Sequence, residues 1–363
     1  MKSSDGKSGG REFMSIILLS MMVKVSDTTP ALLYQAGLTA AWLIPLLSLL
    51  IIAGPLLLLQ HLLKRYNVGL IELLYKLTGR YVGFIIGMSA FTIMFWGTVV
   101  NSRSYADIVN FMFYPKTPLI ILYTLLIAAS CYIASKGLET LGRTSWVIIP
   151  YVIGVYLILV ALVRKDIELA NLAPYMGPGF GQVAVSSFKY SSIFAEVFLL
   201  SIFYPCVRSD KEYRYANWLG LGTVVLLMML FLIIFVAVFD FHSTRKEAFP
   251  FQHLTRFADI GPYIQHIEAL FLGFWVMAGV VHFGIYIYIV TAILGQTLKL
   301  DKWEPLLLPM SGLILFTGML PENITATLLL SRERLLFLAS LFFIVLPLLL
   351  SLLNMVRRRS IST

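Results

Sequence analysis

The stretch FMSIILLSMMVKVSDTTPALLYQA, residues 13–36, decides how this chain folds. Its first half is an unbroken apolar run that suits an α-helix, but a polar run begins at Lys24 and ends at Pro30. Pro30 removes a backbone donor and clashes with the preceding turn, so the residue before it is pushed toward extended geometry. Side chains that favour hydrogen bonds to nearby backbone over a helix fill the gap: Ser26, Asp27, Thr28 and Thr29. We therefore expect a helix that breaks around residues 25–30.

The alternative interpretation is that SDTTP is a simple loop after a first helix that ends near residue 25. At 1.5 Å per residue that helix would be only about 20 Å long, too short for a hydrocarbon core about 30 Å thick. Unwound backbone at membrane depth is tolerated only where it faces protein or a water-filled cavity. Broken helices of this kind form substrate sites in secondary transporters, so the break also predicts a binding site.

The composition indicates a membrane protein. Of the 363 residues, 59% are hydrophobic and 13% are charged, compared with roughly 25% charged in soluble domains. The mean hydropathy of +0.85 excludes a soluble enzyme, a disordered chain and a secreted disulfide scaffold. Two cysteines in apolar runs and five scattered histidines form no metal-ligand or disulfide pattern. We expect an all-α polytopic membrane protein that is not an enzyme and needs no metal and no cofactor.

Ten apolar runs approach the length of about 20 residues that a transmembrane helix needs. The expected spans are 13–36, 39–63, 80–110, 117–135, 145–163, 187–206, 215–240, 264–297, 304–321 and 332–356. The domain organisation that follows is a cytoplasmic tail over 1–12, a permease-like transmembrane domain over 13–356 and a basic cytoplasmic tail over 357–363.

The net charge of +9 is attributed to cytoplasmic loops and not to nucleic-acid binding. With the N-terminus inside, most Lys and Arg residues in the connections fall on the cytoplasmic side, so both termini are predicted there. Residues 67–79 predict a short interfacial helix on that face. The outer segments 164–186 and 241–263 predict short helices or a lid.

Polar groups at membrane depth are the place to look for function, since a charge there costs about 2.5–3.5 kcal/mol on insertion scales. Glu196 in the sixth span is such a group, and its alternative role is that of a protonated or serine-paired structural carboxyl. In the eighth span Trp275, His282 and Tyr286 follow at steps of seven and four, hence on one face. That face either lines a pocket or packs in the core.

Charged residues within single spans offer two possible ion pairs. Arg103 and Asp107 are one helical turn apart and are expected to pair structurally. Lys24 either pairs with Asp27 or extends toward the membrane surface. Asp27 and Glu196 are the deep acids available for coupling to H⁺ or Na⁺.

Several motifs resemble the spore germination permease family. LYQAGLTAAWL at 33–43 is similar to the small-residue and tryptophan element that follows the family's first span. LTGRYVG at 77–83, KTPL at 116–119 and GLETLGR at 137–143 also match. The most specific resemblance is AFPFQ at 248–252 followed by IQHIEALFLGFWV at 264–276, although His266 stands where the family usually has arginine.

The resemblance implies a fold of the amino acid–polyamine–organocation superfamily: a five-plus-five inverted repeat of about ten transmembrane helices with discontinuous spans 1 and 6. It also implies the B subunit of a nutrient germinant receptor in the spore inner membrane, a multi-pass cell-membrane protein. The implied partners are A-type and C-type subunits and a small germinant, commonly an amino acid. By analogy the pocket lies among spans 1, 3, 6 and 8.

From span position and chemistry we expect these ligand-binding residues: Ser26, Asp27, Thr28, Thr29, Trp96, Glu196, Phe198, His282 and Tyr286. Backbone donors at the break would meet a ligand carboxylate, and carbonyls or a carboxylate of the sixth span would meet its ammonium. A secondary amino-acid transporter coupled to H⁺ or Na⁺ is the alternative function and uses the same pocket. The break in the first span disfavours a purely structural scaffold.

Overall fold

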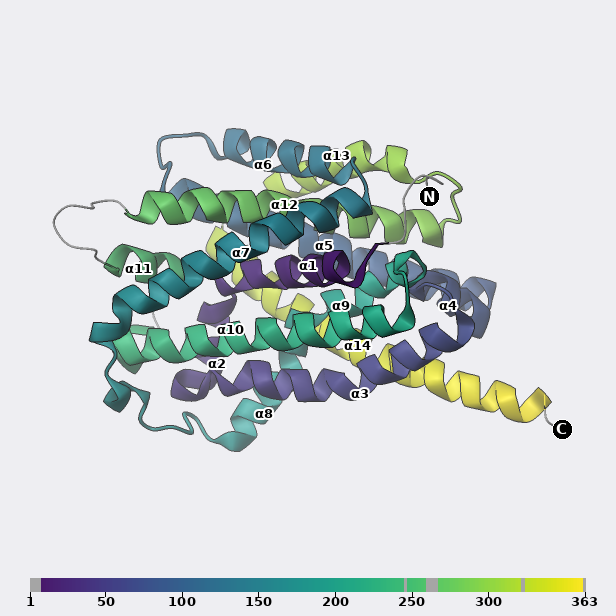
Figure 1. The fold of residues 1–363 in the computed structure, drawn as a ribbon, viewed down its shortest axis with the longest axis horizontal. Helices are drawn as coiled ribbons and strands as arrows, with labels where there is room; N and C mark the ends of the chain where they lie inside the picture. Colours follow the sequence, from purple (N-terminus) through teal and green to yellow (C-terminus); the bar gives the residue numbers. More distant parts are fainter. Residues whose placement is uncertain (1–7, 245–246, 259–266, 321–323, 362–363) are drawn as a thin grey trace.

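The computed structural model describes residues 8–244, 247–258, 267–320 and 324–361, and its long helices run side by side along one axis (Figure 1). Six described helices are long and apolar enough to cross a membrane. They are α3 (Leu43–Tyr66), α5 (Arg80–Met112), α7 (Leu138–Leu162), α10 (Asp210–Thr244), α12 (Ile267–Thr297) and α14 (Ile324–Ile361). The chain is therefore an all-α, multi-pass membrane protein, as its composition predicts.

Shorter apolar helices cover the remaining predicted spans. A bent pair, α1 (Gly10–Met22) and α2 (Thr29–Gly37), raises the number of candidate spans in the described chain to seven. The short apolar helices are α6 (Leu119–Ala134), α9 (Glu196–Leu199) with the 3-10 turn Leu200–Cys206, and α13 (Leu307–Met319) after a 3-10 turn.

The first span is broken as predicted. α1 continues into the 3-10 turn Val23–Val25, and the two halves of the span meet at 62°. Pro30 lies in the first turn of α2, where its missing N–H has no intrahelical partner to lose. The Asp27 carboxylate accepts a hydrogen bond from the Thr29 N–H at 2.6 Å. The break is thus made by local side chains, which is why the sequence alone predicts it.

α1 and α12 form the centre of the bundle. Every side chain from Ser15 to Met22 is buried, which is typical of a helix surrounded by other helices. α1 packs against α7, α10 and α12, and α12 also packs against α5 and α6. The apolar part of α12 is 83% buried, compared with 22–61% in the other long helices. The break and the polar face of α12 therefore lie deep inside the protein.

The sixth predicted span, 187–206, is made of several short pieces. α8 (Phe180–Lys189) is followed by the 3-10 turn Ser191–Phe194, then by α9 and the turn Leu200–Cys206. The Ser192 hydroxyl donates to the Leu336 carbonyl at 2.6 Å, and the Ser192 N–H donates to the Ser340 hydroxyl at 2.9 Å. Hydrogen bonds to α14 therefore replace regular helix bonds in this segment.

Short helices mark the two ends of the bundle. α4 (Leu70–Thr78) is a short helix within the segment predicted to be interfacial, and it lies at the same end of the bundle as the start of α1 and the C-terminal end of α14 (Figure 1). α11 (Pro250–Phe257) lies at the opposite end, within the outer segment predicted to form short helices.

Helices extend into both predicted tails. α1 begins at Gly10, and the Ser8 N–H donates to the Cys206 carbonyl at 2.8 Å, so part of the predicted tail 1–12 belongs to the fold. α14 extends to Ile361 and therefore includes most of the predicted tail 357–363. Both ends continue as ordered helix because they pack on, or extend, a span.

One glycine allows a close approach that the fold needs. A Cβ atom on Gly69 would lie 2.5 Å from the Ile202 carbonyl oxygen, whereas Gly54 in α3 has open space around it. Gly69 precedes α4, and Ile202 belongs to the broken sixth segment. The contact therefore positions α4 against that segment.

We expect Gly69→Ala to lower the free energy of unfolding by about 1–3 kcal/mol, because a backbone carbonyl cannot move aside as a flexible side chain can. Gly54→Ala is the matched control and should be neutral or stabilising by up to about 1 kcal/mol, since alanine favours a helix. Thermal unfolding of both variants in one detergent measures the difference. Equal midpoints would contradict the close approach.

Candidate functional site

Two buried ion pairs lie at the break in the first span. Lys24 Nζ is 2.5 Å from Glu196 Oε1, and their side chains are 7% and 8% exposed. Arg332 Nη2 is 2.6 Å from Asp27 Oδ2, with 6% and 9% exposure. Removing one partner of a buried pair leaves an uncompensated charge and is strongly destabilising. The two pairs together carry no net formal charge and join the break in the first span to α9 and α14, so we call these four side chains the neutral cluster.

The first pair links the facing ends of two short helical segments. Lys24 lies in the turn that ends the first half of span 1, and Glu196 is the first residue of α9. A cation at a helix C-terminus and an anion at an N-terminus are both favourable placements. Lys24 Nζ also donates to the Ile193 carbonyl at 2.5 Å, and the Tyr286 hydroxyl donates to Glu196 Oε1 at 2.5 Å. Within the described chain Glu196 Oε2 has no hydrogen-bond partner.

The second pair, Asp27–Arg332, connects the break to α14. The Arg332 guanidinium donates to the Thr29 hydroxyl at 2.7 Å and also to the Thr28 hydroxyl. Arginine presents several donors in a rigid plane, so one side chain bonds Asp27, Thr28 and Thr29 together.

Side chains of α11 and α12 also form hydrogen bonds with residues at the break. The Ser26 carbonyl accepts from Gln252 Nε2 of α11 at 2.7 Å, and the Ser26 hydroxyl accepts from Trp275 Nε1 at 2.8 Å. His282 Nδ1 is 3.1 Å from the Leu19 carbonyl. Trp275, His282 and Tyr286 thus share one face of α12 that is directed at the first span, as their spacing predicts.

Most of the predicted ligand-binding residues meet at this break. Those that do are Ser26, Asp27, Thr28, Thr29, Glu196, His282 and Tyr286. Phe198 packs instead against Phe343 of α14, with ring centroids 5.7 Å apart. Trp96 does not join the cluster, because its side chain is 41% exposed on the surface of α5.

The partners of the deep charges differ from the prediction. Lys24 does not pair with Asp27, because Glu196 takes the ammonium and Arg332 takes the Asp27 carboxylate. The predicted tenth span, 332–356, begins at Arg332, which places the arginine at the end of that span. α14 begins at Ile324 and so carries Arg332 inward along the bundle, buried to 5% exposure.

The structure also bears on the expected Arg103–Asp107 pair and on the backbone donors at the break. Arg103 and Asp107 form the predicted pair at 3.0 Å, and Arg103 also donates to the Gly318 carbonyl at 2.6 Å, which ties α5 to α13. The Thr29 N–H, expected to meet a ligand carboxylate, already donates to Asp27. The protein's own carboxylate thus occupies the position predicted for the ligand's.

The break has little free space. A cavity of about 30 Å³ is bounded by Lys24, Thr29, Asn101 and Arg332, and another of about 50 Å³ lies beside Ser26. Such volumes hold a few water molecules at most. Neither of these two cavities of the described chain is large enough for an amino acid.

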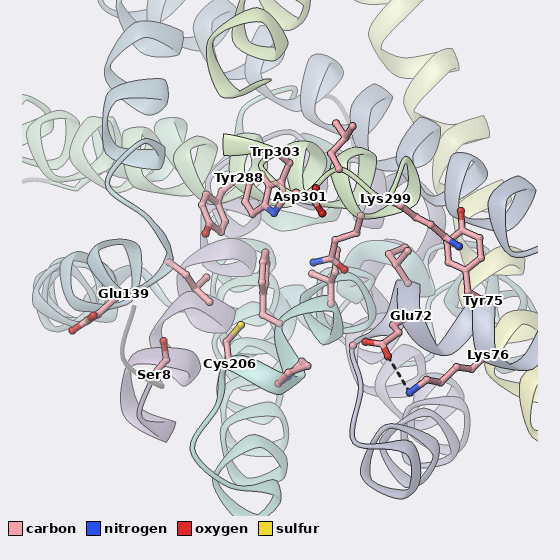
Figure 2. Close-up of a pocket in the computed structure, with 18 residues that line it drawn as sticks. Ser8, Glu72, Tyr75, Lys76, Glu139, Cys206, Tyr288, Lys299, Asp301 and Trp303 are labelled. Atoms are coloured by element: carbon pink, nitrogen blue, oxygen red, sulfur yellow. Dashed lines mark ion pairs between the residues drawn. The ribbon is translucent and has the colours of Figure 1, made fainter. Parts of the chain in front are cut away.

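A much larger cavity of about 740 Å³ opens at the α4 end of the bundle (Figure 2). Tyr288 and Trp303 form part of its aromatic wall, with ring centroids 5.0 Å apart. Its rim is charged, and Figure 2 shows the Glu72–Lys76 ion pair there, at 3.0 Å. The broken sixth segment contributes Ile202 to its lining. Among the cavities bounded by described residues, the one at the α4 end is thus far larger than the two at the break.

Comparison with known sequences places these features in a family. A family model described as spore germination protein (Spore_permease) matches residues 11–327. Spore germination protein KB of Bacillus subtilis (strain 168) is 24% identical over 204 residues, 55% of this chain and 54% of that protein. Spore germination protein A2 of the same organism is 26% identical over 241 residues, 66% of each chain. Putative spore germination protein YfkT, also from that organism, is 26% identical over 280 residues, 76% of this chain and 75% of the relative.

Solved structures show the same fold in transporters. MhsT in complex with L-phenylalanine has a TM-score of 0.66 at 15% identity, covering 93% of this chain and 87% of that chain. Mhp1, a nucleobase-cation-symport-1 family transporter in a closed conformation with bromovinylhydantoin bound, has a TM-score of 0.65 at 13% identity, covering 94% and 78%. Identities this low bear on the fold alone, whereas the family model spans most of the sequence: the protein belongs to the spore germination permease family.

Proposed function

We propose that this protein is the B-type subunit of a nutrient germinant receptor, and that it binds an amino acid at the break in its first span. The observation that carries the proposal is the neutral cluster of two buried ion pairs, Lys24–Glu196 and Asp27–Arg332. An amino acid carries one ammonium and one carboxylate, so it can pair with both sides of this cluster without leaving a net charge in the core.

The contacts suggest how the ligand lies. Its ammonium faces Glu196 Oε2, the carboxylate oxygen that lacks a partner in the described chain. Its carboxylate faces Arg332 near the N-terminus of α2, a favourable place for an anion. His282 and Tyr286, whose ring centroids are 4.2 Å apart, border the ligand side chain.

Binding at this site moves helices. The cavity between Lys24 and Arg332 is about 30 Å³, too small for an amino acid, so the ligand favours a state in which α14 stands farther from α1. A ligand shifts such an equilibrium by its differential affinity for the two states. A-type and C-type partner subunits would then read the position of α14.

The proposed architecture has ten spans. The bent pair, the six long helices and the three shorter apolar helices supply them. We place the breaks of a five-plus-five inverted repeat at residues 26–28 and around Ala195, and the protein in the spore inner membrane. The family match and the transporter fold support this arrangement.

A secondary amino-acid transporter is the second candidate. The 740 Å³ cavity at the α4 end favours it, because a transporter needs a path from its site to one side of the membrane. Mhp1, which shares the fold, is a cation symporter by its title. Receptor and transporter use the same pocket and differ in whether solute crosses.

We expect single amino acids from a panel to raise the thermal midpoint of the purified protein in lipid nanodiscs. A ligand that binds only the folded state stabilises it by roughly 2.7 kcal/mol at a hundred times its Kd. For each amino acid that acts, the matching amine without a carboxylate and the matching acid without an ammonium should leave the midpoint unchanged. Equal effects of the amine would refute the paired-charge site.

Arg332→Met should abolish amino-acid-dependent stabilisation and cost about 3–5 kcal/mol of stability, because the Asp27 carboxylate loses its buried partner. Arg334→Met is the matched control, since Arg334 lies two residues on in the same helix and is exposed. Arg332→Met/Asp27→Asn should regain stability but not the amino-acid response. A double variant that responds normally would remove Arg332 from the binding site.

Solute counterflow in proteoliposomes separates receptor from transporter. We expect no exchange of labelled amino acid with the wild-type protein under conditions where the same amino acid raises its thermal midpoint. Counterflow of an amino acid that also stabilises the protein would decide for the transporter.

A further inference from the structure

We propose that the Lys24 ammonium is a tethered cation: it fills a monovalent-cation site at the break, so that the protein uses no free Na⁺ or K⁺ there. The proposal concerns the protein without germinant and does not depend on which ligand the pocket takes.

The ammonium is held by oxygen atoms of the kind that bind small cations. Lys24 Nζ lies 2.5 Å from the Ile193 carbonyl oxygen and 2.5 Å from Glu196 Oε1. Ile193 belongs to a 3-10 turn of the irregular sixth segment. In transporters with broken helices, unwound carbonyls and the C-terminal ends of half-helices coordinate the coupling cation. Lys24 has one group of this kind, the carbonyl of an irregular segment, and a carboxylate beside it.

The local field favours a positive charge at this point. Lys24 lies where the first half-helix ends, so the negative end of its dipole is directed at the ammonium. The Tyr286 hydroxyl donates a hydrogen bond to Glu196 Oε1, the same oxygen that accepts from Lys24. Because Glu196 and Lys24 neutralise each other, and Asp27 and Arg332 do likewise, a second cation would leave an unpaired positive charge in the core.

Methionine at position 24 tests the ammonium alone. Its side chain is unbranched and one atom shorter than that of lysine, so Lys24→Met keeps the apolar stem and removes the charged end. The vacated position would retain the Ile193 carbonyl and the Glu196 carboxylate, which are both acceptors and cannot hydrogen-bond each other. A desolvated monovalent cation would then have both a charge to neutralise and space to occupy.

The experiment compares thermal midpoints in NaCl, KCl and choline chloride at equal ionic strength, with no amino acid present. Wild type should show the same midpoint in all three salts. Lys24→Met should be less stable than wild type in choline chloride, and its thermal midpoint should rise by roughly 2 °C in NaCl or KCl at about ten times the Kd of the cation.

Two further variants serve as controls. Lys24→Met/Glu196→Gln should lose this salt specificity. Lys64→Met, which removes a lysine that is 60% exposed, is the matched control and should show none.

A specific Na⁺ or K⁺ effect on wild type would overturn the proposal, as would a folded Lys24→Met that does not distinguish the three salts. If Lys24→Met is not recovered in any salt, the wild-type comparison decides: a cation-specific midpoint overturns the proposal and its absence supports it. Because no germinant is added, failure here leaves the amino-acid site untouched, and failure of the amino-acid panel leaves the tethered cation untouched.

Discussion

A helix that breaks inside a membrane exposes backbone donors and acceptors that lipid cannot satisfy. In this protein side chains bond several such groups at the break and in the sixth segment, some from nearby residues and some from distant parts of the chain. Gln252 of α11 bonds the Ser26 carbonyl, Asp27 bonds the Thr29 N–H, and Lys24 bonds the Ile193 carbonyl. The long helices are arranged so that α11, α14 and the sixth segment can deliver these groups to one place.

The features that the sequence reveals are those set by neighbouring residues. Pro30 and Asp27 make the break locally, and Arg103 meets Asp107 one turn away. Lys24 and Glu196 are 172 residues apart, and Asp27 and Arg332 are 305 apart. No spacing rule connects such residues, since their pairing follows from helix packing. Arg332 is hidden further because an arginine before an apolar run usually marks a membrane boundary.

The exposed position of Trp96 follows from the periodicity of α5. The buried stripe of α5 runs through small or unbranched residues at steps of three and four, namely Gly83, Gly87, Ala90, Met94 and Thr98. Trp96 lies off this stripe and faces outward. An aromatic residue in a span therefore indicates a pocket only when it is in phase with the small residues that let helices approach.

Hydrogen bonds of Ser8 and Gly10 hold the end of α1 that lies away from the break. The Ser8 carbonyl accepts from the Arg208 N–H at 3.2 Å, and the Gly10 N–H donates to Glu212 at 2.7 Å. The start of α1 is thus bonded to Arg208, just after the sixth segment, and to Glu212 of α10, while the Lys24–Glu196 pair joins the first and sixth segments at the break. α1 has 13 residues, a length of about 20 Å. Tilting α1 by about 10° about the break would displace its far end by roughly 3 Å. Because Ser8, which precedes α1, lines the large cavity, a tilt of α1 that follows separation of the Lys24–Glu196 pair would move part of the cavity wall.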